Sequence, residues 1–191
     1  MPLIVETIVT TKNAKGEVHI APLGLIAEGA NWLLAPFRPS RTLDNLREVP
    51  FAVASHTDDV RVFAGCLTGR KSWPTRGADE IDGAVLENAV SHWELAVDRM
   101  TEDDVRPRFS CRVVHAASHR PWAGFNRAQA AVLECAVLVS RLKMLPADKI
   151  EAELKYLEIA ISKTAGEREQ EAWGWLMERI EAWRAEQAQK V

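Results

Sequence analysis

Residues 36–46, PFRPSRTLDNL, concentrate side chains that could do chemistry at one point of the chain. A strand-like apolar run gives way here to a helix-like run, so a helix is predicted to begin near Ser40 or Thr42. The first N–H groups of a helix are unpaired and carry partial positive charge, which suits an anion. The two hydroxyls add donors, and Arg38 and Arg41 add forked cationic donors that match phosphate oxygens. These residues alone leave two interpretations open: a phosphate site, or a helix cap beside two solvated arginines.

Two further stretches carry weaker signals of the same kind. GFNRAQAAVLE, residues 124–134, predicts a helix capped by Asn126 with Arg127 in its first turn. A cation there opposes the helix dipole, so either an anion lies nearby or an exposed arginine is tolerated at small cost. APLG, residues 21–24, interrupts a strand with proline and glycine, which indicates an edge, a bulge, or close approach of the backbone to a ligand.

Several familiar sites are absent from the sequence. There is no GxGxxG and no GxSxG, and GRKS at residues 69–72 has Arg70 where a P-loop requires glycine. His115 and His119 are four apart, but in a strand end that spacing does not bring two imidazoles together, so no metal site is expected. No acid, base or nucleophile is identified as catalytic.

Composition narrows the class of protein. The chain has 191 residues, 47% of them hydrophobic, and a formal charge of -3, which indicates an ordinary globular protein and argues against nucleic-acid or membrane-surface binding. Its three cysteines form no CxxC pair and lie in apolar segments, so reduced, buried thiols and a cytoplasmic location are expected. The longest apolar run, AAVLECAVLVSRLKML, is interrupted by charges, and neither a membrane span nor a signal peptide is predicted.

The first part of the chain reads as strands and turns. Alternation and turn residues predict strands over residues 3–11, 17–26, 32–37, 51–56, 60–69, 92–100 and 106–116. A short helix ended by Pro50 follows the third strand, and residues 69–83 are expected to form a long surface loop. Seven short strands without alternating long helices favour a closed or nearly closed barrel over a doubly wound sheet.

From residue 125 the apolar residues recur at steps of three and four. This period predicts three antiparallel helices, with Pro146 and Gly166 at the joints. Trp173, Trp175 and Trp183 occupy core-like positions in the last helix. The expected organisation is a barrel over residues 1–124 and a helical region over residues 125–191 that packs on it.

Four segments in combination resemble a known family: ETIVTTKNAKGEVHIAPLG, PFRPSRTLDNL, HTDDV and GFNRAQAAVLECAVL. They are similar to the domain family of unknown function numbered 447, from about residue 4 to beyond residue 165. The resemblance implies an α+β fold, an FMN-binding split β-barrel related to flavin reductases and pyridoxine phosphate oxidases, with a C-terminal three-helix appendage. In that superfamily FMN lies in a groove between the two barrels of a homodimer.

The resemblance also implies which residues hold FMN. Carried over residue by residue, the phosphate would be held by Arg38, Ser40, Arg41 and Thr42, with Asn45 bracing the turn, and the isoalloxazine would lie along Ala21, Pro22, Leu23 and Gly24. The ribityl chain or the ring would be reached by His56 and Thr57. Asn126 or Arg127 of the partner subunit would reach the ring edge or the phosphate. The implied function is a homodimeric FMN flavoprotein that passes electrons between a small-molecule donor and acceptor. The alternative is a non-catalytic module that stores, senses or delivers flavin.

Overall fold

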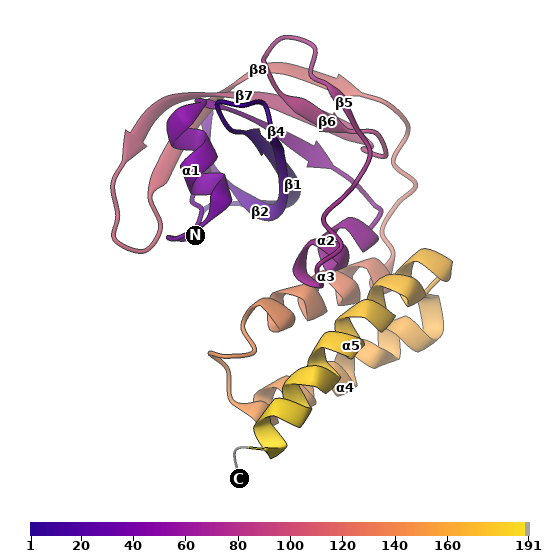
Figure 1. Cartoon of the computed structure of the whole chain (residues 1–191). Helices are drawn as coiled ribbons and strands as arrows, with labels where there is room; N and C mark the ends of the chain where they lie inside the picture. Colours follow the sequence, from indigo (N-terminus) through magenta and orange to yellow (C-terminus); the bar gives the residue numbers. More distant parts are fainter. Residues whose placement is uncertain (190–191) are drawn as a thin grey trace. The chain divides into compact units, whose positions relative to one another are not determined.

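A computed structural model describes residues 1–189 and divides the chain into two compact units (Figure 1). The first unit comprises residues 1–57 and 72–122, and the second comprises residues 58–71 together with the chain from residue 123 onward. The division differs from the expected boundary near residue 124 in one respect. Residues 58–71, inside the predicted barrel segment, belong to the helical unit.

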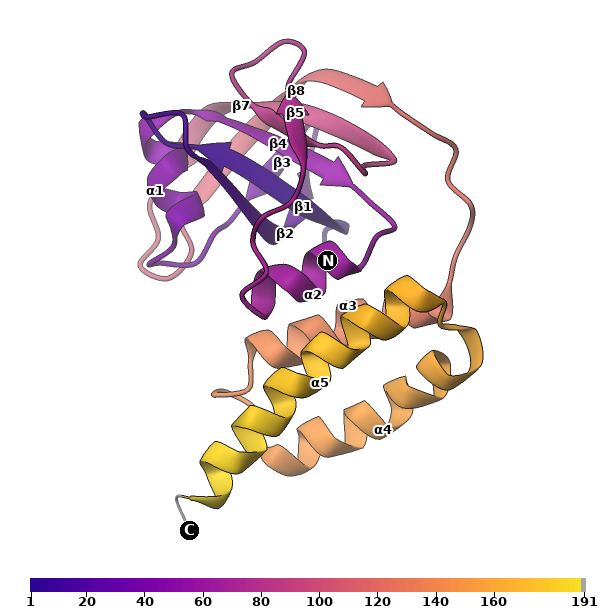
Figure 2. The same cartoon turned by 45° about the vertical axis from the view of Figure 1, so that its right-hand side comes forward.

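The first unit is a closed antiparallel barrel of six strands in the order β1-β2-β3-β8-β7-β4 (Figure 2). The strands are β1 (Ile4–Lys12), β2 (Val18–Glu28), β3 (Asn31–Leu34), β4 (Phe51–His56), β7 (Ser91–Thr101) and β8 (Arg108–Ser118). The barrel prediction is confirmed. Alternation along each strand turns one set of side chains inward, and this set includes Val9, Leu25, Leu95, Phe109 and Cys111.

A short helix, α1 (Arg41–Glu48), contributes to the same core. Leu43 and Leu46, three residues apart on one face, are both almost fully buried among the inward side chains of the barrel. Burial of a leucine contributes about 1.5–3 kcal/mol, so these two residues fix α1 against β1 and β2. The helix ends before Pro50, as its sequence predicts.

The segment predicted as a long surface loop is partly strand. Within it and beyond, β5 (Thr75–Gly77) pairs with β6 (Ala84–Leu86) as a separate two-stranded ribbon. The ribbon lies on the outside of the barrel, where the Thr10 hydroxyl donates to the Ala84 carbonyl and the Leu86 N–H donates to Ser55 Oγ at 3.3 Å. The glycine and mixed charge of this segment predicted a loop. Its strands are stabilised by partners on β1 and β4, which the local sequence does not indicate.

The first element of the second unit is a helix and not the predicted strand. Residues 60–69, predicted as a strand, contain the helix α2 (Arg61–Leu67). The run is apolar almost throughout, so it lacks the alternation that separates a half-buried strand from a buried helix. Val60 and Ala64, four residues apart, enter the core of the helical unit, and packing against α3 and α5 decides in favour of the helix.

The three predicted C-terminal helices are confirmed as α3 (Arg127–Ser140), α4 (Ala147–Thr164) and α5 (Glu167–Ala188). Pro146 and Gly166 stand at the N-cap positions of α4 and α5. The shared core contains Cys135, Leu138, Ile150, Leu154, Leu176, Ile180 and Trp183, with Trp173 and Trp175 packed at its margin. Within residues 1–189, no helix combines the length and apolarity needed to cross a bilayer.

Candidate functional site

The N-terminus of α1 is organised by Ser40. The Ser40 hydroxyl accepts from the N–H of Leu43 at 3.3 Å, and the Ser40 carbonyl accepts from the N–H of Asp44 at 3.1 Å. The predicted helix start near Ser40 or Thr42 is therefore confirmed, and Ser40 is the N-cap residue. Within residues 1–189, the N–H groups of Arg41 and Thr42 donate to no protein acceptor. Two donors at the positive end of the helix are left for another acceptor.

The two arginines of this segment differ in their partners. Arg41 is exposed, and its guanidinium forms no ion pair with any residue that the structure describes. Arg38 lies 2.7 Å from a carboxylate oxygen of Glu102, which also pairs with Arg47 at 2.7 Å. Only Arg41 brings positive charge to the helix terminus that no carboxylate offsets.

Thr42 and Asn45 face the barrel rather than solvent. Thr42 is 5% exposed, and within residues 1–189 its hydroxyl has no hydrogen-bond partner. Asn45 is 3% exposed and donates from Nδ2 to the hydroxyl of Thr11 on β1 at 3.0 Å. Asn45 thus ties α1 to the barrel wall, whereas Thr42 has a hydroxyl to offer beside the two N–H groups.

Residues Ala21–Gly24 lie in the middle of β2. They pair in continuous register with β1 and contain no bulge, while the pairing of β2 with β3 begins only at Ile26. Of the three interpretations of this segment, the edge is confirmed, and the proline is accommodated there as expected. A Cβ at Gly24 would lie 2.7 Å from Cγ2 of Ile4, so the missing side chain makes room for β1.

His56 and Thr57 lie at the far end of β4 from α1, because β4 begins at Phe51, three residues after α1 ends, and runs about 17 Å to His56. Nδ1 of His56 is 3.2 Å from the Ser91 hydroxyl, and its ring meets Trp93 edge-on at 4.6 Å. Burial lowers the pKa of His56 despite its hydrogen bond with Ser91, so the imidazole is neutral at pH 7. No hydrogen bond or ring contact of His56 reaches residues 38–45.

Asn126 and Arg127 belong to the helical unit. The Asn126 side chain caps α3 as predicted, accepting from the N–H of Ala128 at 2.7 Å, and its amide donates to the Thr164 carbonyl at 3.1 Å. Arg127 is exposed and lines a groove of about 270 Å³ between α3 and α4, together with Tyr156 and Ile159. The oxygen and the nitrogen of the Asn126 side chain are thus both hydrogen-bonded. Within residues 1–189, the Arg127 guanidinium forms no hydrogen bond or ion pair.

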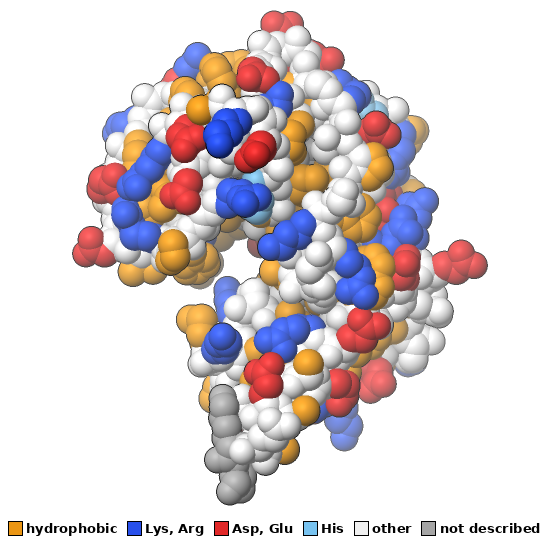
Figure 3. All heavy atoms as spheres, viewed as in Figure 1, with side chains coloured by type: hydrophobic (Ala, Val, Ile, Leu, Met, Phe, Trp, Pro, Cys, Tyr) orange, Lys and Arg blue, Asp and Glu red, His pale blue; other side chains and the backbone are white. Residues whose placement is uncertain are grey.

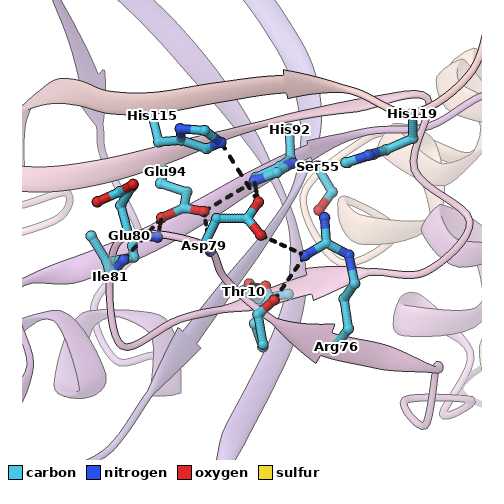
Figure 4. A network of polar contacts seen from close by, with 12 residues as sticks. Thr10, Ser55, Arg76, Asp79, Glu80, Ile81, His92, Glu94, His115 and His119 are labelled. Carbon is cyan, nitrogen blue, oxygen red and sulfur yellow. Dashed lines mark hydrogen bonds and ion pairs between the residues drawn. The ribbon is translucent and has the colours of Figure 1, made fainter.

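Sequence reasoning missed a second polar cluster, shown in Figure 4. Asp79, His92, Glu94 and His115 each offer one ligand atom, and these four atoms lie within 4.8 Å of one another. His115 and His119 do not converge on each other along the chain; each instead approaches His92 on the neighbouring strand. The available signal was the pattern His-x-Glu at residues 92–94, which places both side chains on one face of a strand.

The closed six-stranded barrel, with a capped helix packed into its core, defines the class of protein as a split β-barrel of the FMN-binding type. Solved structures support this fold. A crystal structure of an FMN-bound protein from Methanosarcina mazei superposes with a TM-score of 0.82 at 20% identity, covering 94% of this chain and 96% of that one. Flavoredoxin from Methanosarcina acetivorans gives 0.51 at 15% identity, over 62% and 69% of the two chains. Component B of nitrilotriacetate monooxygenase from Bacillus cereus gives 0.51 at 18%, over 62% and 70%.

Family models identify the chain more closely. The model described as the N-terminal domain of the protein of unknown function DUF447 matches residues 5–120, and the DUF447 model for the following part matches residues 126–178. The protein belongs to the DUF447 family, as its sequence motifs indicated. No curated protein matches the chain.

Proposed function

We propose that the protein binds FMN with the phosphate at the N-terminus of α1. The observation that carries this proposal is the set of donors without protein partners at that terminus: two backbone N–H groups, the Thr42 hydroxyl and the Arg41 guanidinium. A helix N-terminus with an adjacent arginine suits a phosphate dianion in both charge and geometry. Ser40 holds the turn by capping, and Asn45 fixes α1 to Thr11.

The flavin ring is assigned to the open edge of β2 at Ala21–Gly24. An unpaired strand edge presents backbone N–H and C=O groups, which match the donors and acceptors along the edge of an isoalloxazine. Packing of α1 against β2 supports one ligand spanning both places. Arg127 of a second copy is the better candidate for a contact from the partner, since the Asn126 amide is already engaged.

A homodimer is the second element of the proposal. Phe37 and Val105, both more than half exposed, lie beside each other next to the phosphate turn, where the Arg38 N–H donates to the Val105 carbonyl at 2.9 Å. Large exposed apolar side chains grouped at one place favour a protein contact. A second copy that covered them would also enclose the flavin site.

An oxidoreductase is the activity that best fits such a site. Bound FMN supplies hydride and electron transfer, and the chain contributes position, charge and exclusion of water. Similarity in fold to flavoredoxin and to a monooxygenase component supports transfer between a small-molecule donor and acceptor.

The binding proposal is tested by fluorescence titration of the purified protein with FMN. We expect the double variant R41A/T42A to bind FMN at least about 100-fold more weakly, because each charge-assisted hydrogen bond to phosphate contributes about 1.5–3 kcal/mol. R47A is the matched control: Arg47 lies on the same helix, is exposed and pairs with Glu102. Equal FMN affinity in R41A/T42A and wild type would show that Ser40 and its neighbours form a cap only.

Turnover and assembly need separate measurements. The FMN-loaded protein is mixed with NADH or NADPH without oxygen, and loss of flavin absorbance is the expected result. Flavin that stays oxidised with each donor would favour a module that binds flavin without turning over. Light scattering is expected to give twice the mass of the 21.3 kDa chain, and a monomer with bound FMN would contradict the dimer.

A further inference from the structure

The Asp79–His92–Glu94–His115 cluster lies on the outer face of the barrel, within the first unit. His92 and Glu94 are two residues apart on β7 and therefore share a face, and His115 is directly opposite Glu94 on β8. Asp79 comes from the turn between β5 and β6, which folds over these strands (Figure 4). Three separate segments of the chain thus point two imidazoles and two carboxylates at one place.

The spacing of the four ligand atoms matches the edges of a metal coordination shell. Nε2 of His92 is 3.1 Å from Oε1 of Glu94 and 3.6 Å from Oδ2 of Asp79, and the same Asp79 oxygen is 3.6 Å from Nε2 of His115. Four ligands placed tetrahedrally at about 2.0–2.2 Å from a zinc ion are separated by about 3.3–3.6 Å. The remaining pairs of ligand atoms are within 4.8 Å, so side-chain shifts of about 1 Å would bring the cluster to this geometry.

Glu94 has one acceptor position directed into the cluster. Its carboxylate accepts the N–H groups of Asp79 at 2.6 Å, Glu80 at 2.8 Å and Ile81 at 3.0 Å, which fill three of about four lone-pair sites. The fourth, on Oε1, faces His92. Three backbone N–H groups therefore hold the buried carboxylate with one oxygen directed into the cluster.

His92 has the outer partner that a ligating histidine requires. Nδ1 of His92 is 2.9 Å from Nε2 of His119, and the two rings stack at 5.0 Å with an angle of 9°. In the tautomer in which Nδ1 of His92 donates to His119, the lone pair of Nε2 faces Glu94 and Asp79. Ligating histidines are commonly oriented in this way by their second nitrogen.

We propose that Asp79, His92, Glu94 and His115 bind one divalent transition-metal ion, with Zn²⁺ the best fit. The two carboxylates would balance the charge of the ion, and imidazole nitrogen and carboxylate oxygen are both ligands that zinc accepts. An entry path exists, since the side chains of Asp79 and His115 are 44% and 32% exposed whereas His92 and Glu94 are fully buried. The ion would clamp the β5–β6 turn onto β7 and β8.

The test uses tag-free, FMN-loaded protein, stripped with a chelator and dialysed. Calorimetric titration with ZnCl₂ is expected to show one tight site per chain, and Zn²⁺ is expected to raise the Tm. H115A and D79N each remove one partly exposed ligand, so the fold is retained, and each should weaken Zn²⁺ binding at least tenfold. D82N is the matched control, because Asp82 lies in the same turn but pairs with Lys12.

A third variant separates a positioning effect from a general loss of fold. H119A removes only the outer partner of His92 and is expected to weaken Zn²⁺ about 10- to 100-fold, as such partners generally do. FMN affinity in all variants should equal that of wild type, which shows that the barrel is intact. The proposal is overturned if the wild type binds no stoichiometric Zn²⁺, or if H115A and D79N bind it as tightly as D82N does.

Discussion

Asn45 offers the sharpest test of how the barrel positions the proposed phosphate site. Its amide donates to Thr11 at 3.0 Å, and both side chains are at most 3% exposed. In N45A the Thr11 hydroxyl loses its donor in a buried place, which costs about 1–3 kcal/mol. The cavity left by the amide, about 25 Å³, adds about 0.6 kcal/mol. We therefore expect a loss of about 2–4 kcal/mol in the free energy of unfolding.

Urea denaturation followed by circular dichroism measures this loss, and a second pair of variants isolates its cause. N45L keeps the branched outline of the side chain but removes the donor, whereas N45L/T11V replaces both partners by apolar groups of similar shape. Because the cost arises from an unpaired buried group, the double variant should be more stable than N45L. If N45L/T11V loses the sum of the two single losses, the hydrogen bond is not what holds α1, and the reasoning fails.

FMN affinity gives an independent outcome for the same variants. Asn45 acts on the ligand only by fixing α1, so N45A should weaken FMN less than R41A/T42A does, and in proportion to its effect on α1. A variant N45A of unchanged stability that no longer binds FMN would instead place the Asn45 amide on the ligand itself. The two roles are thus distinguished by comparing stability with affinity.

Further predictions concern buried charge and thiols. In R61A the carboxylate of Asp59, whose side chain is 3% exposed, loses its ion pair with Arg61 at 2.7 Å. We expect about 2–3 kcal/mol of destabilisation in urea, against less than about 1 kcal/mol for the exposed control E171Q. Burial by itself raises the pKa of Asp59, but the hydrogen bonds and charge of Arg61 outweigh burial and leave the pKa lowered. The stability contributed by the ion pair is therefore present above about pH 4 and is lost as the pH falls further. D59N should reduce the loss of stability below about pH 4. Burial raises the pKa of Cys66 to about 11 and the pKa of Cys111 and of Cys135 to about 12. Iodoacetamide at pH 8 should therefore label no thiol in the native protein and three thiols in urea. Rapid labelling of Cys66 in the native protein would contradict its burial.

The sequence predicted those elements whose periodicity is local. The three C-terminal helices and the long barrel strands follow from steps of three and four and from alternation, and the caps at Ser40 and Asn126 follow from residue type. The strand predicted over residues 60–69 was wrong, because this run is apolar almost throughout and no period distinguishes helix from strand. Packing against α3 and α5, distant in sequence, makes that choice.

The parts of the sites that escaped prediction depend on long-range pairing. The ligand cluster needs the β7–β8 register that sets Glu94 opposite His115, together with a turn that brings Asp79 over β7. Neither the strand register nor the position of this turn can be predicted from the residues that flank any one histidine. The same holds for the arginines of PFRPSRT: local chemistry made them equivalent, and a carboxylate 64 residues away distinguishes them.

That carboxylate leads to a last prediction. Glu102 pairs with Arg38 and Arg47 at once, so Arg38 reaches the proposed phosphate only by exchanging one anion for another. In E102Q this competition is removed, and FMN should bind about two- to fivefold more tightly, the range expected for one exposed ion pair. The gain should shrink in high salt, because exposed charges are screened. R38A/E102Q is the control: if Arg38 carries the gain, this double variant loses it. If E102Q and R38A both bind FMN as wild type does, Arg38 serves only to hold the β7–β8 hairpin, and the phosphate is bound by Arg41, Thr42 and the helix terminus alone.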